Sequence, residues 1–221
     1  MTARRIAGLA AALVLLHLVL IQPNHPQALT WGALRLFPLE LPAILLAMVA
    51  LPAAGWPSRL LRAGLAAALT VIAALKVADF AMFVSFNRGF NPVVDPHLAV
   101  AGWHLASGAV GTATAALAVA GAVAALVVLA GGLWRGLSAW AGIEPPRPAL
   151  RPVAGLAAVA AGALAVAEAG WAMRAWALPF DPPGAAFTAR VGAERVSMAR
   201  RTLADLTEFR AAAARDPLAG A

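Results

Sequence analysis

The amino-acid sequence predicts an all-α polytopic membrane protein, with five transmembrane helices followed by a C-terminal amphipathic helix. Three observations lead to this fold class. Hydrophobic residues make up 62% of the 221 residues and charged residues only 12%, whereas a soluble domain carries roughly 25% charged residues. The mean hydropathy is +0.80, and five long apolar segments alternate with arginine-bearing loops. So little polar surface cannot cover the chain in water, and lipid must be the solvent for much of it.

The chain is basic, with a formal net charge of +7 from 17 Lys and Arg against 10 Asp and Glu. The basic residues flank the apolar segments or lie in the C-terminal tail, so membrane topology and anionic lipid headgroups account for them. We therefore predict the lipid bilayer, including anionic lipids, as a partner, and we predict no binding to nucleic acid. The chain contains no cysteine, which excludes disulfides and thiolate chemistry.

The first predicted span is Ile6–Ile21, which follows two arginines and is apolar except for His17. A cleaved signal peptide is the alternative, with Ala28 as the cleavage residue. Pro26 argues against cleavage because it occupies a position where a small residue is required, and the apolar run is long for a signal peptide. We therefore expect an uncleaved helix.

The next four predicted spans contain several ionisable residues. The second, Trp31–Leu51, includes Arg35 and Glu40 and is expected to be kinked by its two prolines. The third, Ala63–Phe86, contains Lys76 and Asp79. The polar connection after it is expected to hold a short interfacial helix from Pro96 to about Leu105. The fourth span is Leu105–Leu133, and the fifth is Pro152–Leu178, which bears Glu168. A transmembrane domain over 1–180 and a connecting helix within 181–221 follow.

The arginines of the short loops predict the orientation. One set of alternate loops carries Arg4, Arg5, Arg59, Arg62, Arg135, Arg147 and Arg151. The opposite short loops carry only Arg88, with Arg35 just inside a span. Positive residues accumulate on the cytoplasmic side of membrane proteins. The N-terminus is therefore expected in the cytoplasm, and five spans place the tail in the periplasm of a bacterial inner membrane.

Five charged residues in or next to the apolar segments form a candidate polar or headgroup site: Glu40, Lys76, Asp79, Glu168 and Arg174. Placing an ionisable group inside a membrane costs free energy unless the group is paired or solvated. Each of these residues is therefore expected to have a partner or a functional role. Lys76 and Asp79 are three residues apart and share one helix face. They form either a neutralised intrahelical pair or part of a polar pocket towards the outer leaflet.

The sequence contains no catalytic motif and no complete metal site. We find no GxSxG, Walker or dinucleotide-binding pattern, and we assign no catalytic, cofactor-binding or metal-binding residue. His97 and His104 are seven apart and, with Asp95 and His25, offer zinc ligands in principle. Interfacial or helix-capping histidines are the alternative, because no tight ligand spacing is present.

The predicted helix at Ala185–Ala214 carries an apolar stripe at Val196, Ala199, Leu203 and Leu206. Charged residues of both signs surround the stripe. Its candidate docking residues are Arg195, Arg200, Arg201, Leu203 and Leu206. This helix lies either on anionic lipid or against a following soluble domain, and the mixed charge favours the second.

The connection FNRGFNPVVDPHL and the tail RVSMARRTLADLTEFR, together with five spans and an outward-facing tail, suggest a family. The chain resembles the N-terminal membrane portion of bacterial membrane-anchored sulfatase-like hydrolases of the alkaline phosphatase superfamily, such as lipoteichoic acid synthases and lipid A phosphoethanolamine transferases. The resemblance implies an extracytoplasmic α/β catalytic domain that binds a divalent metal, often zinc or manganese, and uses a Ser, Thr or formylglycine nucleophile. The metal-binding Asp/His set and the nucleophile motif are absent from these 221 residues.

Three functions follow as hypotheses. The resemblance implies a membrane anchor that orients substrate for an extracytoplasmic sulfatase-like hydrolase or transferase and is not catalytic by itself. The alternative is a stand-alone scaffold or accessory subunit of a bacterial membrane complex. A transporter that uses the intramembrane charges is less favoured, because five spans cannot divide into the two equal repeats typical of that class.

Overall fold

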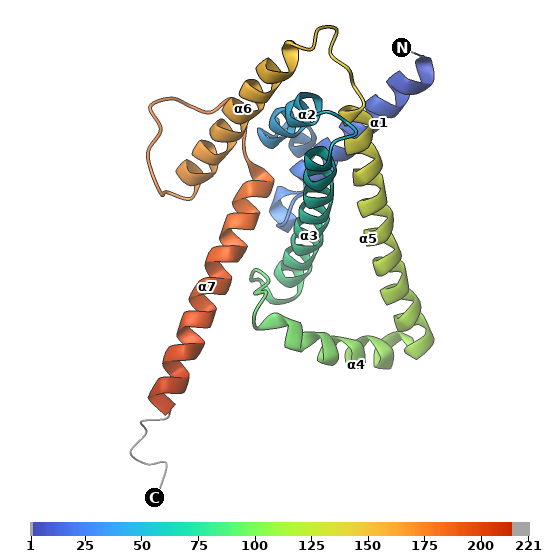
Figure 1. Ribbon diagram of the computed structural model, residues 1–221. Helices are drawn as coiled ribbons and strands as arrows, with labels where there is room; N and C mark the ends of the chain where they lie inside the picture. The colour runs from blue at the N-terminus through green and yellow to red at the C-terminus, as the bar shows by residue number, and fades with distance from the viewer. Residues whose placement is uncertain (1, 214–221) are drawn as a thin grey trace, which may run out of the picture.

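The computed structural model describes residues 2–213, which are all-helical as predicted. Seven α-helices occur in this part of the chain: α1 (Ala3–Ile21), α2 (Glu40–Ala50), α3 (Trp56–Phe86), α4 (Leu98–Val110), α5 (Thr112–Ala141), α6 (Leu150–Ala172) and α7 (Phe187–Ala213). Three short 3-10 helices complete it: η1 (Pro26–Ala28), η2 (Trp31–Arg35) and η3 (Asp95–His97). Helices α1, α2, α3, α5 and α6 form a bundle, and α7 extends away from it (Figure 1).

Four helices, α1, α3, α5 and α6, are long and apolar enough to cross a membrane. The second predicted span, Trp31–Leu51, is instead divided into η2, an extended stretch and α2. Helix α2 has 11 residues, or about 16 Å at 1.5 Å per residue, about half of a hydrocarbon core of roughly 30 Å. Pro38 explains the division, because a proline disfavours helical geometry at the residue before it.

The fourth predicted span is also divided, at Gly111. This glycine has φ 84° and ψ 149°, a conformation that residues with a side chain rarely adopt. The chain therefore turns sharply between α4 and α5, and α4 runs across the end of the long helices (Figure 1). The short helix expected from Pro96 to about Leu105 starts at Leu98 and continues to Val110.

The main core lies where α1, α2, α3 and α5 meet. Fully or nearly buried side chains from each helix contribute to it: Leu16, Leu20, Ile44, Met48, Leu69, Ala73, Leu133 and Leu137. A smaller cluster joins α6 to the residues just before α2 and α7 through Leu39, Ala165, Ala169 and Ala186. Alanines dominate the α6 contact, which allows close helix approach as in membrane-embedded bundles.

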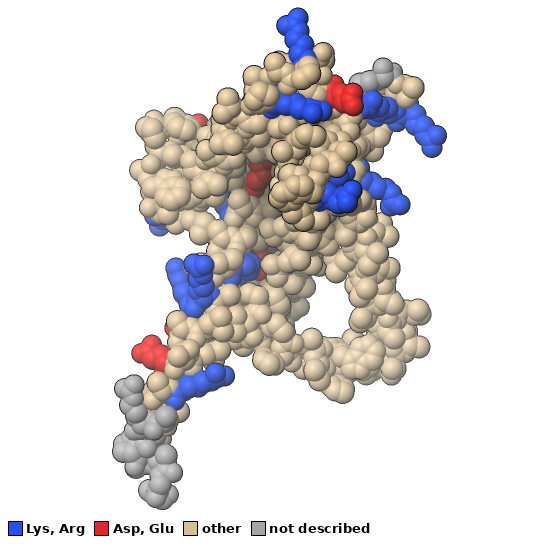
Figure 2. Space-filling view, viewed as in Figure 1, with Lys and Arg blue, Asp and Glu red and all other residues tan. Residues whose placement is uncertain are grey.

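The arginine-rich connections lie at one end of the bundle. Arg5 of α1 donates to the carbonyl oxygen of Gly142, just after α5, at 2.5 Å. Arg62 of α3 donates to Ser138 Oγ of α5 at 3.0 Å and lies over the Trp134 ring. The start of α1, the start of α3 and the end of α5 therefore come together, and the basic side chains there are visible in Figure 2.

The connection between α6 and α7 folds back onto the start of α2. The backbone of Ala185 exchanges two hydrogen bonds of 3.1 Å with Phe37 and Leu39. Gly184 lies against the carbonyl oxygen of Phe37 so closely that a Cβ there would collide with it. This short parallel bridge sets the starting position of α7, at the end of α1 opposite the arginine-rich connections.

Candidate functional site

Two buried carboxylates from different helices cap the N-terminus of α7. Oε1 of Glu40, on α2, accepts hydrogen bonds from the backbone N–H groups of Thr188 (2.8 Å) and Ala189 (3.0 Å). Oε2 of Glu168, on α6, accepts from the N–H of Ala186 at 2.7 Å. The first N–H groups of a helix lack partners within it, and negative charge there is stabilising. The two acids therefore cap a helix that begins without a capping side chain of its own.

Glu168 also forms an ion pair with a cation from α7. Its carboxylate binds Nε and Nη2 of Arg190, which lies one turn into the helix. Burial lowers the pKa of the Arg190 guanidinium, and the charges of Glu40 and Glu194 oppose that shift. Arg190 thus neutralises Glu168 from a different part of the chain.

Lys76 has the converse role at the C-terminus of α1. Its Nζ donates to the carbonyl oxygens of Leu20 (2.8 Å) and Val19 (3.3 Å), in the last turn of α1, and to Thr188 Oγ1 (3.1 Å). Thr188 Oγ1 in turn donates to Leu20 at 3.2 Å. A cation at a helix C-terminus is favourable. Lys76, only 1% exposed, therefore ties α1, α3 and α7 together.

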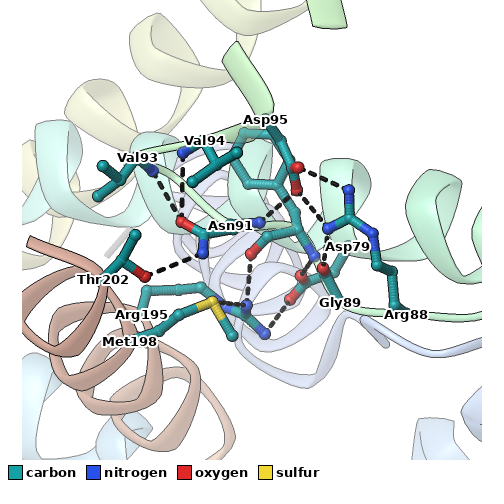
Figure 3. A network of polar contacts seen from close by, with 11 residues as sticks. Asp79, Arg88, Gly89, Asn91, Val93, Val94, Asp95, Arg195, Met198 and Thr202 are labelled. Carbon is teal, nitrogen blue, oxygen red and sulfur yellow. Dashed lines mark hydrogen bonds and ion pairs between the residues drawn. The ribbon is translucent and has the colours of Figure 1, made fainter. Parts of the chain in front are cut away.

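Asp79, one turn further along α3, forms an ion pair with α7. Its carboxylate lies 3.0 Å from Arg195 Nη2 and accepts from the N–H of Phe90 at 2.8 Å and from Asn24 Nδ2 at 3.3 Å. Arg195 Nη1 also donates to the carbonyl oxygen of Phe90 at 2.6 Å. Figure 3 shows Asp79 and Arg195 pointing toward each other from α3 and α7. Both side chains are buried.

Together these groups form a site that we name the α7 clamp. It consists of Glu40, Lys76, Asp79 and Glu168 with their α7 partners Thr188, Arg190 and Arg195. Three residues of α7, Thr188, Val191 and Arg195, are buried at spacings of three and four residues, so one face of the helix makes the contact. The clamp groups come from α2, α3, α6 and α7.

The loop between α3 and α4 extends the contact along α7. Asn91 Nδ2 donates to Thr202 Oγ1 at 3.0 Å. Asp95 holds the loop by accepting from two nitrogens of Arg88 (2.6 and 2.8 Å) and from the N–H of Asn91 (2.6 Å). The Arg88 hydrogen bonds hold the pKa of the Asp95 carboxyl below its ordinary value. The loop thereby supports α7 beyond the clamp (Figure 3).

We expect Asp95 to make the stability of the protein depend on pH below about 5. Its folded pKa is lower than its ordinary value, about 3.9 in an unfolded chain. Its stabilisation is therefore complete above that value and is lost as the pH falls through the folded pKa. Thermal unfolding of Asp95→Asn and the parent protein should differ most at pH 6, and the difference should shrink towards pH 3. The exposed Asp205→Asn is the control, and a difference independent of pH would contradict the assignment.

The structure brings four of the five predicted site residues to the start of α7 and leaves one out. Arg174 is exposed, with φ 58° in the connection after α6, and forms no ion pair in the described part of the chain. The intrahelical pair between Lys76 and Asp79 is also absent there. Lys76 binds two carbonyl oxygens of α1 and Thr188, whereas Asp79 binds Arg195.

Of the predicted docking residues of the tail, one is buried against the bundle and the others are exposed. Arg195 is 8% exposed and packs within its own chain, whereas Arg200 and Arg201 are exposed. Leu203 and Leu206 are also exposed, as is Val196. The face of α7 that packs on the bundle is therefore not the apolar stripe predicted from sequence. What the exposed stripe contacts stays a prediction, and residues 214–221 of the predicted 181–221 segment lie outside the described residues.

The histidines do not assemble into a metal centre in the described residues, where no group of three or more His, Asp or Glu side chains is placed to hold an ion. Asp95 is engaged by Arg88. His25 lies 4.3 Å, ring centroid to ring centroid, from Phe83 and caps η1 through Nδ1. His25 is therefore a helix-capping histidine, the alternative to a zinc ligand.

The α7 clamp is suited to holding a helix in a fixed direction. Its charges are mutually balanced, because Lys76, Arg190 and Arg195 offset Glu40, Asp79 and Glu168. Compared with family models, curated proteins and solved structures, the chain matches none. The sulfatase-like resemblance therefore rests on the sequence segments that suggested it.

Proposed function

We propose that this chain is a membrane anchor whose α7 holds an extracytoplasmic sulfatase-like hydrolase or transferase in a fixed orientation and presents lipid-linked substrate to it. One observation carries the proposal. The first three turns of α7 are held by four bundle residues through buried hydrogen bonds and two ion pairs. The rest of the helix extends away from the bundle (Figure 1).

The physical argument concerns stiffness. A flexible tether requires no buried charge at its origin, and breaking one buried pair by removing a partner costs about 3–5 kcal/mol. A 27-residue helix is about 40 Å long. An arm of this length, fixed at its base, transmits the orientation of the bundle to whatever it carries.

The proposed location is the bacterial inner membrane, with the N-terminus in the cytoplasm and α7 in the periplasm. The contacts of Arg5 and Arg62 with the end of α5 support it, since they gather the basic connections at one end of the bundle. The clamp lies at the other end of α1, next to Leu20 and Lys76. This separation is the one expected when positive loops stay in the cytoplasm.

The experiment is to isolate the native polypeptide from its membrane, determine its intact mass, and assay hydrolysis of a membrane-impermeant sulfate or phosphate ester by intact cells. We expect a mass well above 22.5 kDa, with hydrolysis that a chelator abolishes and that a strain lacking the gene does not show. A 22.5 kDa species without gene-dependent hydrolysis would contradict the enzyme-anchor proposal.

The second candidate is an accessory subunit of a membrane complex. The exposed apolar side chains of α7, including Leu203 (55% exposed) and Phe209 (73% exposed), favour it, because such a stripe can pack against a helix of another protein. Under this alternative, the 22.5 kDa chain co-purifies with a defined partner. Replacing Leu203 and Phe209 by serine then releases that partner.

A further inference from the structure

A groove lies between α1 and α5 at the arginine-rich end of the bundle, away from the α7 clamp. The two helices are in contact there, because a Cβ at Gly136 would lie only 3.2 Å from the Cβ of Ala12. Beside this contact the groove has a volume of about 360 Å³. We call it the α1–α5 groove, and its wall includes Gly8, Ala11, Leu15, Gly132, Arg135 and Ala139. Both helices are long and apolar enough to cross a membrane, so the groove lies on a surface suited to lipid.

Arg135 is the charged residue in the wall of the groove. Its Nη1 lies 3.6 Å from the position that a Cβ of Gly131 would occupy. The side chain is therefore folded back along α5 towards the middle of the helix, the direction in which helical side chains lean. Arg135 forms no ion pair within residues 2–213. An unpaired charge in a membrane span costs free energy, so we expect an anion from outside the described residues to bind it.

A second arginine lies beyond the other end of the groove. Arg4 precedes Gly8 by four residues, so it is on the face of α1 that lines the groove. It is exposed, and it also forms no ion pair among the described residues. The connections at this end contain a single acidic residue, Glu144, which is exposed and equally unpaired in the described part of the chain. Two cations without carboxylate partners thus flank one groove.

The face that lines the groove continues as an apolar surface towards the middle of the two spans. On α1, Leu18 follows Leu15 by three residues and is 46% exposed. On α5, Val128 precedes Gly132 by four residues and is 73% exposed. Such spacings keep residues on one helix face. An occupant of the groove therefore meets two guanidinium groups and, next to them, an apolar surface, which matches an amphiphile with an anionic head.

The size of the groove argues against a helix of another protein as its occupant. One turn of a helix, about 10 Å wide and 5.4 Å long, takes up roughly 420 Å³, which is more than the whole groove holds. A phospholipid headgroup is only a few atoms wide, and basic pockets between membrane helices bind anionic headgroups. No carboxylate lines the groove to pair with an ammonium group, so a zwitterionic headgroup matches it less well.

We infer that the α1–α5 groove binds one anionic phospholipid. Its phosphate lies between Arg4 and Arg135, and its acyl chains lie along Leu18 and Val128. The site is at the end of the bundle opposite the start of α7, and its occupancy is measured without any enzyme activity. The inference is therefore independent of the proposed enzyme anchor.

The test uses the full chain, purified from membranes in mild detergent and mixed with equal amounts of phosphatidylglycerol and phosphatidylethanolamine that carry the same acyl chains. Native mass spectrometry then counts the lipids retained. We expect one retained lipid per chain, with phosphatidylglycerol preferred. Arg135→Gln should reduce that preference about two- to fivefold, the range expected for one solvent-accessible ion pair. Arg147→Gln removes the same charge from the exposed connection after α5, outside the groove. It is the matched control and should leave the preference unchanged.

A second pair of variants tests the groove itself. Gly8 and Gly64 both lie within helices, and a Cβ at either would have no neighbour within 4 Å. Gly8→Leu should therefore fill the groove without disturbing the fold and abolish lipid retention, whereas Gly64→Leu on α3 should preserve it. The inference is overturned if the parent retains no lipid, retains both lipids equally, or forms a dimer without lipid. An equal loss of preference in Arg135→Gln and Arg147→Gln would also overturn it, because general positive charge would then explain the binding.

Discussion

Replacing Asp79 by leucine is expected to destabilise the protein by about 3–5 kcal/mol, the cost of leaving one member of a buried ion pair without its partner. The guanidinium of Arg195 would remain buried, with only the carbonyl oxygen of Phe90 as a strong acceptor. The N–H of Phe90 and the amide of Asn24 would also lose their acceptor. Denaturant unfolding in detergent micelles, followed by tryptophan fluorescence, measures the change.

Two further variants distinguish the loss of the Asp79–Arg195 ion pair from a general effect of introducing leucine. Asp79→Leu combined with Arg195→Leu should recover most of the lost stability, because removing a whole buried pair is often close to neutral. Asp205→Leu, at an exposed position of α7, should be nearly silent. If the Lys76→Leu and Asp79→Leu double variant proved more stable than Asp79→Leu combined with Arg195→Leu, the assigned pairing would be wrong.

Replacing Glu168 by leucine is expected to cost about 3 kcal/mol or more and to loosen the start of α7, because it orphans a partly buried guanidinium and a buried N–H group. Arg190 loses its ion pair, and the N–H of Ala186 loses its acceptor. Hydrogen exchange should therefore accelerate selectively in the first turns of α7, while the amides of α1 and α3 keep their protection. Peptide-resolved exchange of the detergent-solubilised protein measures this.

The control for Glu168 compares charge with hydrogen-bonding capacity. Glu168→Gln keeps an acceptor for Ala186 and should lose less stability than Glu168→Leu. Glu144→Leu, in the exposed connection after α5, should leave exchange in α7 unchanged. Equal exchange in α7 for Glu168→Leu and the parent would show that Glu168 does not hold the helix.

The sequence indicated that the membrane-embedded charges needed partners, and simple counting shows how many were missing. Glu40, Asp79 and Glu168 carry three negative charges against the single positive charge of Lys76. A buried excess of two charges is too costly to leave uncompensated. Two cations therefore had to come from elsewhere, and Arg190 and Arg195 of α7 supply them. Spacing on one helix suggested Arg174 instead, because it considers only neighbours in sequence.

The predicted grouping of the basic loops does not require five complete spans. Helix α2 is too short to cross a bilayer, yet the chain still returns to the end of the bundle where Arg5 and Arg62 contact residues at the end of α5. A short extended stretch joins η2 to α2 in place of a continuous helix. Hydropathy alone could not distinguish a continuous helix over Trp31–Leu51 from this divided segment.

Composition and hydropathy by themselves determined that the chain is helical and suited to lipid, because apolar length and the absence of backbone partners in lipid leave helices as the simplest solution. They also identified Glu40, Lys76, Asp79 and Glu168 as residues that need partners. Only the tertiary structure decided which partners these are. Capping of α7 by Glu40 and Glu168, and of α1 by Lys76, joins groups up to 149 positions apart. Such contacts depend on how the helix ends are arranged in space, which the periodicity of the sequence does not predict.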